Sequence, residues 1–445
     1  MALNKKEEKE TIILGAGITG LSTGYVSGIP IYESTSDVGG ICNSYYMRKN
    51  SEERLRSQPI DDESYRFENG GGHWIFGGDP SVIRMMRSLT AFKSYPRKAS
   101  VFLKKNNLFI PYPIQNNLSF LDEKISKKAL KEIEKNNPQE TIKTFKDWLF
   151  VNFGKSLCDI FFHPFNNFYT AGLYKIIAPQ DGYKSPVNKE DVKKGFLGKS
   201  NSVGYNTAFI YPEKGLDELM RRLKEGCEIN LNKEARRIDL KDKTIYFSDK
   251  SSVRYKEIIS TIPLDKMIEI TGIKIDEKVN PSTSVLVLNI GAKKGVKCPK
   301  DHWVYMIENK AGFHRVGFYS NVDQSFLPKS NRGENYVSIY VEKAYKKRAT
   351  PTRKEMNEFS KEVIKELKEL DWISEVEVFD PTWIETAYTW SYPKSKWREK
   401  SLKELEKNNI YQIGRYGRWV FQGLADSIKD GLMIGAAFMR KINKI

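Results

Sequence analysis

The sequence predicts an α/β protein in which a doubly wound parallel sheet is accompanied by a helical insertion and an antiparallel sheet. Three observations indicate this fold class: a βαβ unit at residues 11–32, apolar residues at helical spacing within residues 118–199, and strand-like segments between residues 285 and 388. Because the chain has 445 residues, we expect two or three domains rather than a single core.

The doubly wound unit opens the chain. Residues 11–14 are a short apolar run that ends in glycine, which is typical of a buried parallel strand. A helix is expected from about Gly20 and a second strand at residues 29–32. Further along, an amphipathic helix is indicated, followed by a strand at residues 258–263. The apolar positions of that helix are Leu216, Leu219, Met220 and Leu223.

The other two units lie between these segments. In the helical insertion, Phe145, Trp148, Leu149 and Asn152 recur at helical spacing. Residues 136–138 (Asn-Asn-Pro) are expected to break the preceding helix. The later part alternates as strands do, interrupted by one helix with an apolar stripe from Met356 to Leu370. The expected strands are residues 285–290, 302–307, 313–320, 336–342 and 382–388. In the strand at 336–342, one face is formed by Val337, Ile339 and Val341.

These elements predict three domains. The doubly wound domain is discontinuous and is assembled from residues 1–95, 205–270 and 395–445. Residues 115–200 form the helical insertion, and residues 275–390 form the antiparallel-sheet domain, which is expected to carry the substrate site.

The composition narrows the class of protein. Hydrophobic residues are 40% and charged residues 29%, as in soluble globular chains. No apolar run approaches the roughly 20 residues that span a bilayer, and residues 1–10 lack the apolar stretch of a signal peptide. The four cysteines are far apart and form no CxxC pair, and there are only four histidines. We therefore expect a cytoplasmic protein without a disulfide framework, a metal site or a transmembrane segment.

The formal net charge is +17. Lysine-rich runs are most often solvated faces, but such a charge would also attract an anionic partner: a nucleotide sugar, the surface of an acidic membrane or a nucleic acid. No nucleic-acid-binding module is visible, so nucleic acid is not expected as a partner. Peripheral contact with a membrane stays open, and the sequence does not indicate an oligomeric state.

A glycine-rich motif joins the first strand to its helix. In Gly15-Ala16-Gly17-Ile18-Thr19-Gly20, the first glycine permits a tight turn, the second lets the backbone approach a pyrophosphate, and the third lets helix and strand pack closely. Glu33 ends the next strand, where its carboxylate can accept hydrogen bonds from a ribose, and Gly39-Gly40 follows. The sequence therefore predicts a Rossmann-like dinucleotide site, the alternative being a glycine-rich turn without a ligand.

The pattern from Glu33 to Gly40, together with Gly414 and a later helix start at residues 423–427, resembles the two-domain flavoenzymes that include amine oxidases and protoporphyrinogen oxidase. This resemblance implies FAD as the cofactor and Asp426 as the N-cap of the last helix. The expected cofactor-binding residues are Gly15, Gly17, Gly20, Glu33, Gly39, Gly40, Gly72, Thr261, Gly414, Gly423, Asp426 and Ser427.

Four further blocks resemble one branch of that family, the UDP-galactopyranose mutases, especially those of eukaryotes. The blocks are residues 71–76 (GGHWIF), 110–117 (IPYPIQNN), 303–305 with 313–315 (WVY and FHR), and 414–419 (GRYGRW). In these isomerases the reduced flavin N5 attacks the anomeric carbon of the sugar nucleotide and expels the diphosphate. The adduct then opens and recloses as a furanose, without net redox change. The resemblance implies galactofuranose formation for glycan biosynthesis, with NADPH or NADH as the reductant.

The resemblance assigns catalytic roles to His73, Arg315 and Arg415. The two arginines match family residues that hold the diphosphate. Arginine suits this role because its guanidinium is always charged and can donate two hydrogen bonds to phosphate oxygens. His73 matches the histidine beside the flavin ring. If residues 308–312 form the loop of a hairpin, Tyr305 lies opposite Arg315, and Trp303 shares their face. The alternatives are an ordinary aromatic–arginine pair on the surface and a histidine packed in a glycine turn.

Other residues match family positions around the substrate. Tyr112 and Gln115 match residues that contact the uridine side, and the alternative for Tyr112-Pro113 is a rigid turn. Tyr392 matches a tyrosine that contacts phosphate. Asn166 matches an asparagine near flavin and sugar, and the alternative is a buried structural asparagine. Together with Trp303, Tyr305, Arg315, Arg415 and Phe421, they form the expected substrate site.

Three residues in and after the last block depart from the pattern of the eukaryotic mutases. Phe421 replaces a tyrosine that helps to hold the diphosphate, Ala425 replaces an asparagine, and Arg418 adds a charge. The identity of the sugar and of the base therefore stays open. A flavin-dependent mutase is the first functional hypothesis, and an FAD-dependent oxidoreductase of the amine oxidase or protoporphyrinogen oxidase type is the alternative. A non-enzymatic flavoprotein that binds an anionic partner is the third.

Overall fold

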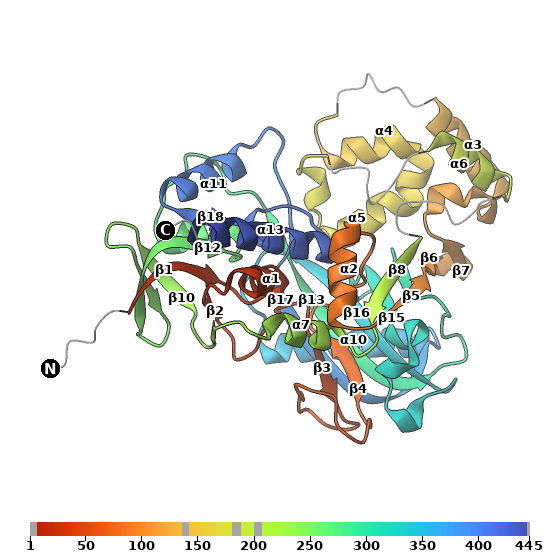
Figure 1. Ribbon diagram of the computed structural model, residues 1–445. Helices are drawn as coiled ribbons and strands as arrows, with labels where there is room; N and C mark the ends of the chain where they lie inside the picture. Colours follow the sequence, from red (N-terminus) through yellow and green to blue (C-terminus); the bar gives the residue numbers. More distant parts are fainter. Residues whose placement is uncertain (1–6, 136–141, 180–187, 200–206, 443–445) are drawn as a thin grey trace.

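The structure is a computed structural model that describes residues 7–135, 142–179, 188–199 and 207–442 (Figure 1). It contains two seven-stranded sheets and a separate group of helices. This is the mixed α/β architecture that the sequence predicts.

The first sheet is built on parallel strands near the two ends of the chain. Its order is β10-β11-β12-β1-β2-β9, with β18 also paired to β12. The parallel members are β1 (Glu7–Leu14), β2 (Ile31–Tyr32), β9 (Ile229–Asn230), β12 (Ser252–Ser260) and β18 (Ile410–Gln412). The antiparallel edge is formed by β10 (Ala235–Asp239) and β11 (Thr244–Phe247). The second expected strand is thus only two residues long, and the strand expected at 258–263 begins earlier and ends at Ser260.

Both faces of this sheet are covered, which makes it doubly wound. Along β1, Ile13 packs on one side, whereas Ile12 and Leu14 pack on the other. The first side is covered by α1 (Ile18–Ser27), α7 (Leu216–Lys224) and α13 (Leu424–Ile442), and the second by α8 (Leu264–Thr271) and α11 (Trp397–Lys407). The first helix begins two residues before Gly20, because Gly17 already occupies its N-cap.

The second sheet has the order β17-β13-β16-β15-β14-β6-β7. Its antiparallel core consists of β17 (Ile373–Thr389), β13 (Ser282–Lys294), β16 (Tyr336–Lys346), β15 (Arg315–Phe318) and β14 (Trp303–Met306). Val337, Ile339 and Val341 share one face as predicted and pack under α10 (Arg353–Glu369). The strand expected at 313–320 stops at Phe318, where the short helix α9 (Tyr319–Val322) begins.

Two strands of this sheet lie outside the segment that the sequence assigned to it. They are β6 (Ala99–Leu103) and β7 (Leu108–Pro111), and β6 runs parallel to β14. The sheet is therefore mixed rather than purely antiparallel. Two parallel strands must be joined by a long crossover. Here β6 ends at Leu103 and β14 begins only at Trp303. Local alternation of side chains could therefore not indicate that these strands pair.

The helical group lies beside this second sheet (Figure 1). Its helices are α3 (Glu123–Glu134), α4 (Phe145–Leu157), the π-helical turn η4 (Cys158–Phe162), α5 (His163–Tyr169) and α6 (Lys189–Phe196). Phe153 and Phe162 stack in its core with ring centroids 3.9 Å apart. The break expected at residues 136–138 lies outside the described residues, although α3 does end just before it.

The remaining elements connect the two sheets. They are the hairpin of β3 (Ser44–Met47) and β4 (Tyr65–Glu68), the helix α2 (Pro80–Leu89), the pair β5 (Phe92–Pro96) and β8 (Ala208–Pro212), and the short helix α12 (Gly414–Gly417). Short 3-10 turns are η1 (Lys104–Asn106), η2 (Ile114–Asn116), η3 (Leu118–Phe120), η5 (Leu173–Lys175), η6 (Gln324–Phe326) and η7 (Lys329–Asn331). Among the described residues, no helix is both long and apolar enough to cross a membrane.

Candidate functional site

The glycine motif forms a turn that admits no side chain at its first and third positions. Gly15 has φ +96°, and a Cβ there would lie 2.2 Å from the Thr261 side-chain oxygen. A Cβ at Gly20 would lie 1.9 Å from the carbonyl oxygen of Gly15. At Gly17, by contrast, a Cβ would meet nothing within 4 Å. The backbone at the helix N-terminus is therefore open to a ligand, which is where a pyrophosphate binds in such motifs.

Glu33 connects the turns that follow β1 and β2. Its buried carboxylate accepts hydrogen bonds from the backbone N–H of Ala16 at 2.7 Å and of Thr35 at 2.9 Å. The N–H of Gly39 donates to the carbonyl of Ala16 at 2.8 Å, and Gly40 lies against Gly17. These predicted cofactor residues thus come together at the carboxyl end of the parallel strands, where α/β sheets bind ligands. The turn, the carboxylate and the open face fit a dinucleotide such as FAD.

The late glycine and the last helix close the same region. Gly414 has φ +72°, and a Cβ there would lie 2.7 Å from the Thr19 side-chain oxygen of α1. Asp426, however, is not the N-cap of α13. The helix begins at Leu424, and the N–H of Ser427 already donates to the carbonyl of Gly423 at 3.0 Å. Asp426 therefore lies within the first turn, where the positive end of the helix dipole stabilises its carboxylate.

His73 follows a glycine segment that packs directly on the second sheet. A Cβ at Gly71 would lie 2.7 Å from a carboxylate oxygen of Glu342, and one at Gly72 would lie 2.2 Å from the Tyr340 hydroxyl. Nδ1 of His73 lies 3.2 Å from the carbonyl oxygen of Gly71. Burial lowers the pKa of His73 to about 4, and the nearby positive charge of Arg415 adds to this effect. The imidazole is therefore neutral at pH 7.

Arg315 lies opposite Tyr305, as the hairpin register predicts. It is not a surface pair, because the arginine is held by Glu342 from the neighbouring strand β16. Nε of Arg315 donates to Glu342 at 2.9 Å and Nη2 at 2.5 Å, and the side chains of Arg315 and Glu342 are 20% and 2% exposed. Burial opposes ionisation of this carboxyl, yet Arg315 and then His314 lower the pKa of Glu342 to about 2.

Arg415, on α12, has a different environment. Its Nη atoms donate to the carbonyl oxygens of Gln422 at 3.1 Å and Ala387 at 3.3 Å, and its guanidinium lies over the rings of Tyr388 and Phe421 at 5.3 and 4.7 Å. Within the described residues it has no carboxylate within 4 Å, and its buried Nε has no hydrogen-bond partner. Arg415 therefore carries a positive charge that no described acidic side chain neutralises at contact distance.

Two tyrosines lie between the arginines. The rings of Tyr169 and Tyr388 are 4.9 Å apart, and Tyr169 also packs on His314 at 5.3 Å. Burial raises the pKa of both phenols, while both Arg315 and Arg415 act to lower it. Since both guanidiniums also act on the pKa of His73, the two arginines lie within electrostatic range of the same tyrosines and the same histidine.

Sequence reasoning missed Glu342, Tyr388, Tyr169 and His314. A signal for Glu342 was present, since the alternation of Val337, Ile339 and Val341 places Tyr340 and Glu342 together on the opposite face. Tyr169 and Tyr388 come from a helix and a strand that are more than 200 residues apart, and no local pattern joins them.

The other predicted substrate residues lie in different elements, and Tyr112 is next to Tyr305, the partner of Arg315. Tyr112 packs on Tyr305 with ring centroids 4.8 Å apart, and Gln115 is completely buried in η2. The amide of Asn166 donates to the carbonyl oxygen of Phe162 at 2.7 Å within the helical group. Tyr392 contacts Lys278, whose Nζ lies 4.2 Å from its ring centroid.

Three further residues complete the surroundings. Trp303 is buried against Phe76 and Phe209, so it supports the site from behind. Phe421 is 49% exposed and covers Arg415. The added charge of Arg418 is paired with Asp430 at 2.9 Å.

Comparisons with known proteins agree with this architecture. A family model described as flavin containing amine oxidoreductase matches residues 29–289, more than half of the chain. A crystal structure of reduced UDP-galactopyranose mutase is similar with a TM-score of 0.79 at 22% identity, over 97% of this chain and 96% of that one. A protein of Exiguobacterium sp. 255-15 described as a protoporphyrinogen oxidase has a TM-score of 0.67 at 13% identity, over 98% and 100%. Cyclohexylamine oxidase from Brevibacterium oxydans has a TM-score of 0.62 at 13% identity, over 98% and 100%. At such identities these likenesses concern the fold.

Proposed function

The chain belongs to the family of flavin-containing amine oxidoreductases, and we propose that it acts as a flavin-dependent nucleotide-sugar mutase. The reaction would interconvert the pyranose and furanose forms of an NDP-hexose, with UDP-galactose as the first substrate to test. When bound, reduced flavin would supply the nucleophile for the anomeric carbon, so that the reaction involves no net redox change. The residues that would hold FAD are those around Gly15, Gly17, Glu33 and Gly414.

The observation that carries the proposal is the pair of arginines that act on the same histidine and tyrosines. Arg415 has no acidic partner within 4 Å among the described residues, and its Nε is buried without a hydrogen bond. A half-buried guanidinium without an acidic partner favours a ligand that supplies the opposite charge. A diphosphate supplies that charge together with the oxygens that the guanidinium N–H groups can bind.

The contact between Arg315 and Glu342 moderates the charge of the site. Glu342 neutralises Arg315 and fixes its orientation through two donors, which leaves Arg415 as the main source of net positive charge. A diphosphate that must leave the sugar and then return needs to be held in place without being bound too tightly. One oriented, neutralised arginine and one uncompensated arginine suit that requirement.

His73 contributes a hydrogen-bonding group without a charge. Because the carbonyl of Gly71 can only accept, Nδ1 carries the proton of the neutral ring and Nε2 is left as an acceptor. A neutral imidazole avoids a third positive charge beside the two arginines.

An FAD-dependent oxidase is the second candidate, because the matching family and two of the similar structures are oxidoreductases by description. The environment of Arg415 argues against an amine substrate. An ammonium ion brought into this space would meet uncompensated positive charge, which raises the free energy of binding.

The two candidates differ in their products. The purified protein, with its flavin reduced by dithionite, NADPH or NADH, is incubated with UDP-, GDP- and dTDP-hexopyranoses, and chromatography detects a new isomer of equal mass. We expect such an isomer only with reduced flavin. Arg415→Ala should lose more than tenfold in affinity for UDP, whereas Arg418→Ala, which removes an exposed arginine paired with Asp430, should bind UDP as the wild type does.

Two outcomes would contradict the proposal. Isomer formation that is equally fast with oxidised flavin would exclude the reduced-flavin nucleophile. Steady hydrogen peroxide production from an amine or a porphyrinogen, with no isomer from any sugar nucleotide, would establish the oxidase.

A further inference from the structure

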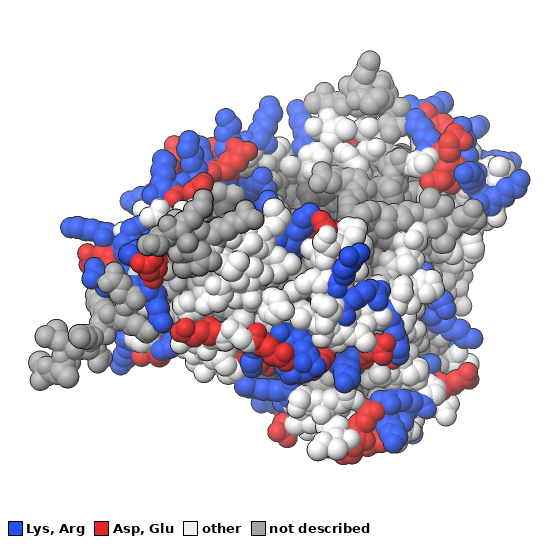
Figure 2. Space-filling model, in the orientation of Figure 1, with Lys and Arg blue, Asp and Glu red and all other residues white. Residues whose placement is uncertain are grey.

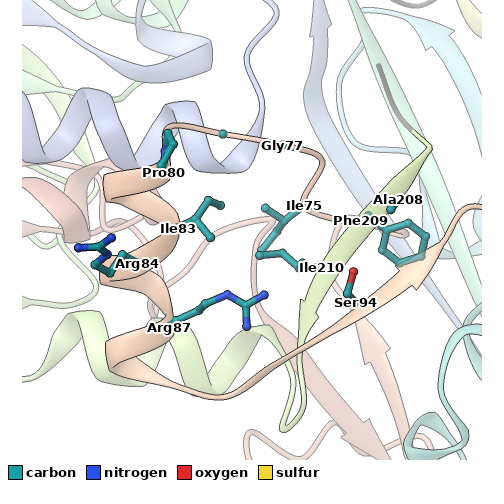
Figure 3. A pocket seen from close by; sticks show the side chains of 11 residues that line it. Ile75, Gly77, Pro80, Ile83, Arg84, Arg87, Ser94, Ala208, Phe209 and Ile210 are labelled. Carbon is teal, nitrogen blue, oxygen red and sulfur yellow. The ribbon is translucent and has the colours of Figure 1, made fainter. Parts of the chain in front are cut away.

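A slot next to α2 is separate from the arginine site. It has a volume of about 510 Å³ and lies between α2, the loop that follows His73, and the strands β5 and β8 (Figure 3). Apolar side chains form its wall, namely Ile75, Ile83, Phe209 and Ile210. Phe209 also packs on Trp303, and the residues that line the slot include none of His73, Arg315 and Arg415. The volume is in the range that takes up small molecules or part of a lipid chain.

Two arginines of α2 accompany this apolar wall. Arg87 reaches across the slot toward Ser94 and Ile210, whereas Arg84 projects from the other side of the helix (Figure 3). There Arg84 lines a second hollow of about 540 Å³ together with Pro80 and Met85. Both arginines are exposed, and in the described part of the chain neither has an acidic partner within 4 Å. Each side of α2 therefore combines apolar surface with an unpaired positive charge.

The surface around α2 has the same character. Figure 2 shows basic side chains over α2 beside a largely uncharged stretch over α1 and α13. The helices α1 and α13 expose large apolar side chains: Tyr25 is 42% exposed, Met433 62% and Met439 39%. Apolar side chains beside positive charges are the combination by which peripheral proteins bind anionic membranes.

We propose that this face docks on an anionic phospholipid bilayer, with an acyl chain in the slot beside α2 and lipid phosphates at Arg84 and Arg87. Charge complementarity selects this occupant, because the chain carries a net charge of +17 and the cytoplasmic surface of membranes is negative. A second copy of the chain would bring like-charged arginines together, which disfavours self-association through this face. The proposal does not depend on the reaction proposed above.

Vesicle co-sedimentation tests the proposal with the full-length, flavin-loaded protein. Vesicles of phosphatidylcholine alone are compared with vesicles of phosphatidylcholine mixed with phosphatidylserine. Each arginine near an anionic surface raises partitioning about fivefold, so the double variant Arg84→Ala/Arg87→Ala should bind the mixed vesicles about 30-fold more weakly. The matched control, Lys104→Ala/Lys105→Ala, removes the same charge from two exposed lysines elsewhere and should bind nearly as the wild type does.

A third variant separates the slot from simple charge attraction. Ala208 is exposed and lines the slot, so Ala208→Trp fills the slot without changing the charge and should also weaken binding to the mixed vesicles. Equal losses in the lysine control, or no loss in Ala208→Trp, would reduce the effect to unspecific electrostatics and overturn the proposal. Absence of vesicle binding would also overturn it, as would a dimer that dissociates when Arg84 and Arg87 are replaced.

Discussion

Replacing Glu342 by glutamine tests how the buried acid supports Arg315. The substitution preserves the size of the side chain but removes the charge that neutralises the guanidinium. Arg315 then stays largely buried, with 20% of its side chain exposed and without its carboxylate partner. Removal of one partner of a buried ion pair typically costs about 3–5 kcal/mol.

The pKa of Glu342 gives an independent magnitude. Its decrease from 4.5 to about 2 corresponds to roughly 3 kcal/mol of stability at neutral pH. Because the pKa is lower in the folded state, this stability is fully present above pH 4.5 and is lost as the pH falls toward 2. We therefore expect Glu342→Gln to reduce the free energy of unfolding by about 3 kcal/mol at pH 7, and by about 1 kcal/mol less at pH 4.

Urea denaturation followed by tryptophan fluorescence, at both pH values and without nucleotide, measures this difference. The matched control is Glu375→Gln, since Glu375 pairs with Lys293 at 2.6 Å but is 58% exposed. Exposed pairs contribute less than about 1 kcal/mol. If Glu342→Gln costs no more than this control, or if its cost is the same at pH 4 and pH 7, the reasoning about the buried pair is refuted.

Three further predictions concern the cofactor turn, the histidine and the helix packing. Gly15→Val should purify without flavin, whereas Gly28→Val, which imposes similar backbone strain where a Cβ meets nothing within 4 Å, should stay yellow; a flavin-loaded Gly15→Val would contradict the proposed site. Burial lowers the pKa of His73 from 6.5 to about 4, so the unfolded chain binds the proton first as the pH falls. The wild type should therefore lose about 2 kcal/mol more stability than His73→Gln between pH 7 and pH 5; parallel losses in denaturation experiments would disprove this. Gly431→Ala would place a Cβ 2.4 Å from the backbone oxygen of Thr19 and so force α13 away from α1. We expect this substitution to lower the free energy of unfolding by about 1–3 kcal/mol; an unchanged melting curve would exclude this.

Most elements of the fold were predictable because their signals are local. The helix Leu216–Lys224 and the shared face of Val337, Ile339 and Val341 follow from side-chain periodicity, which sequence displays directly. The strand expected at residues 11–14 follows from its apolar run, although β1 begins four residues earlier, at Glu7. Element ends were less predictable. Asp426 looked like an N-cap by residue type, but Gly423 already accepts the first hydrogen bond of the helix.

The site divides in the same way. The positive φ of Gly15 and the register of Tyr305 with Arg315 depend on neighbours within one turn or one hairpin, and the sequence alone determined them. The partners of the arginines depend on which distant segments share a space. Only the tertiary structure decided that Glu342 neutralises Arg315, while Arg415 faces Tyr388 with no acidic side chain of the described residues within 4 Å. The physical reason is that the interaction between two charges depends on their distance in space. The number of residues that separate two charged side chains along the chain does not determine that distance.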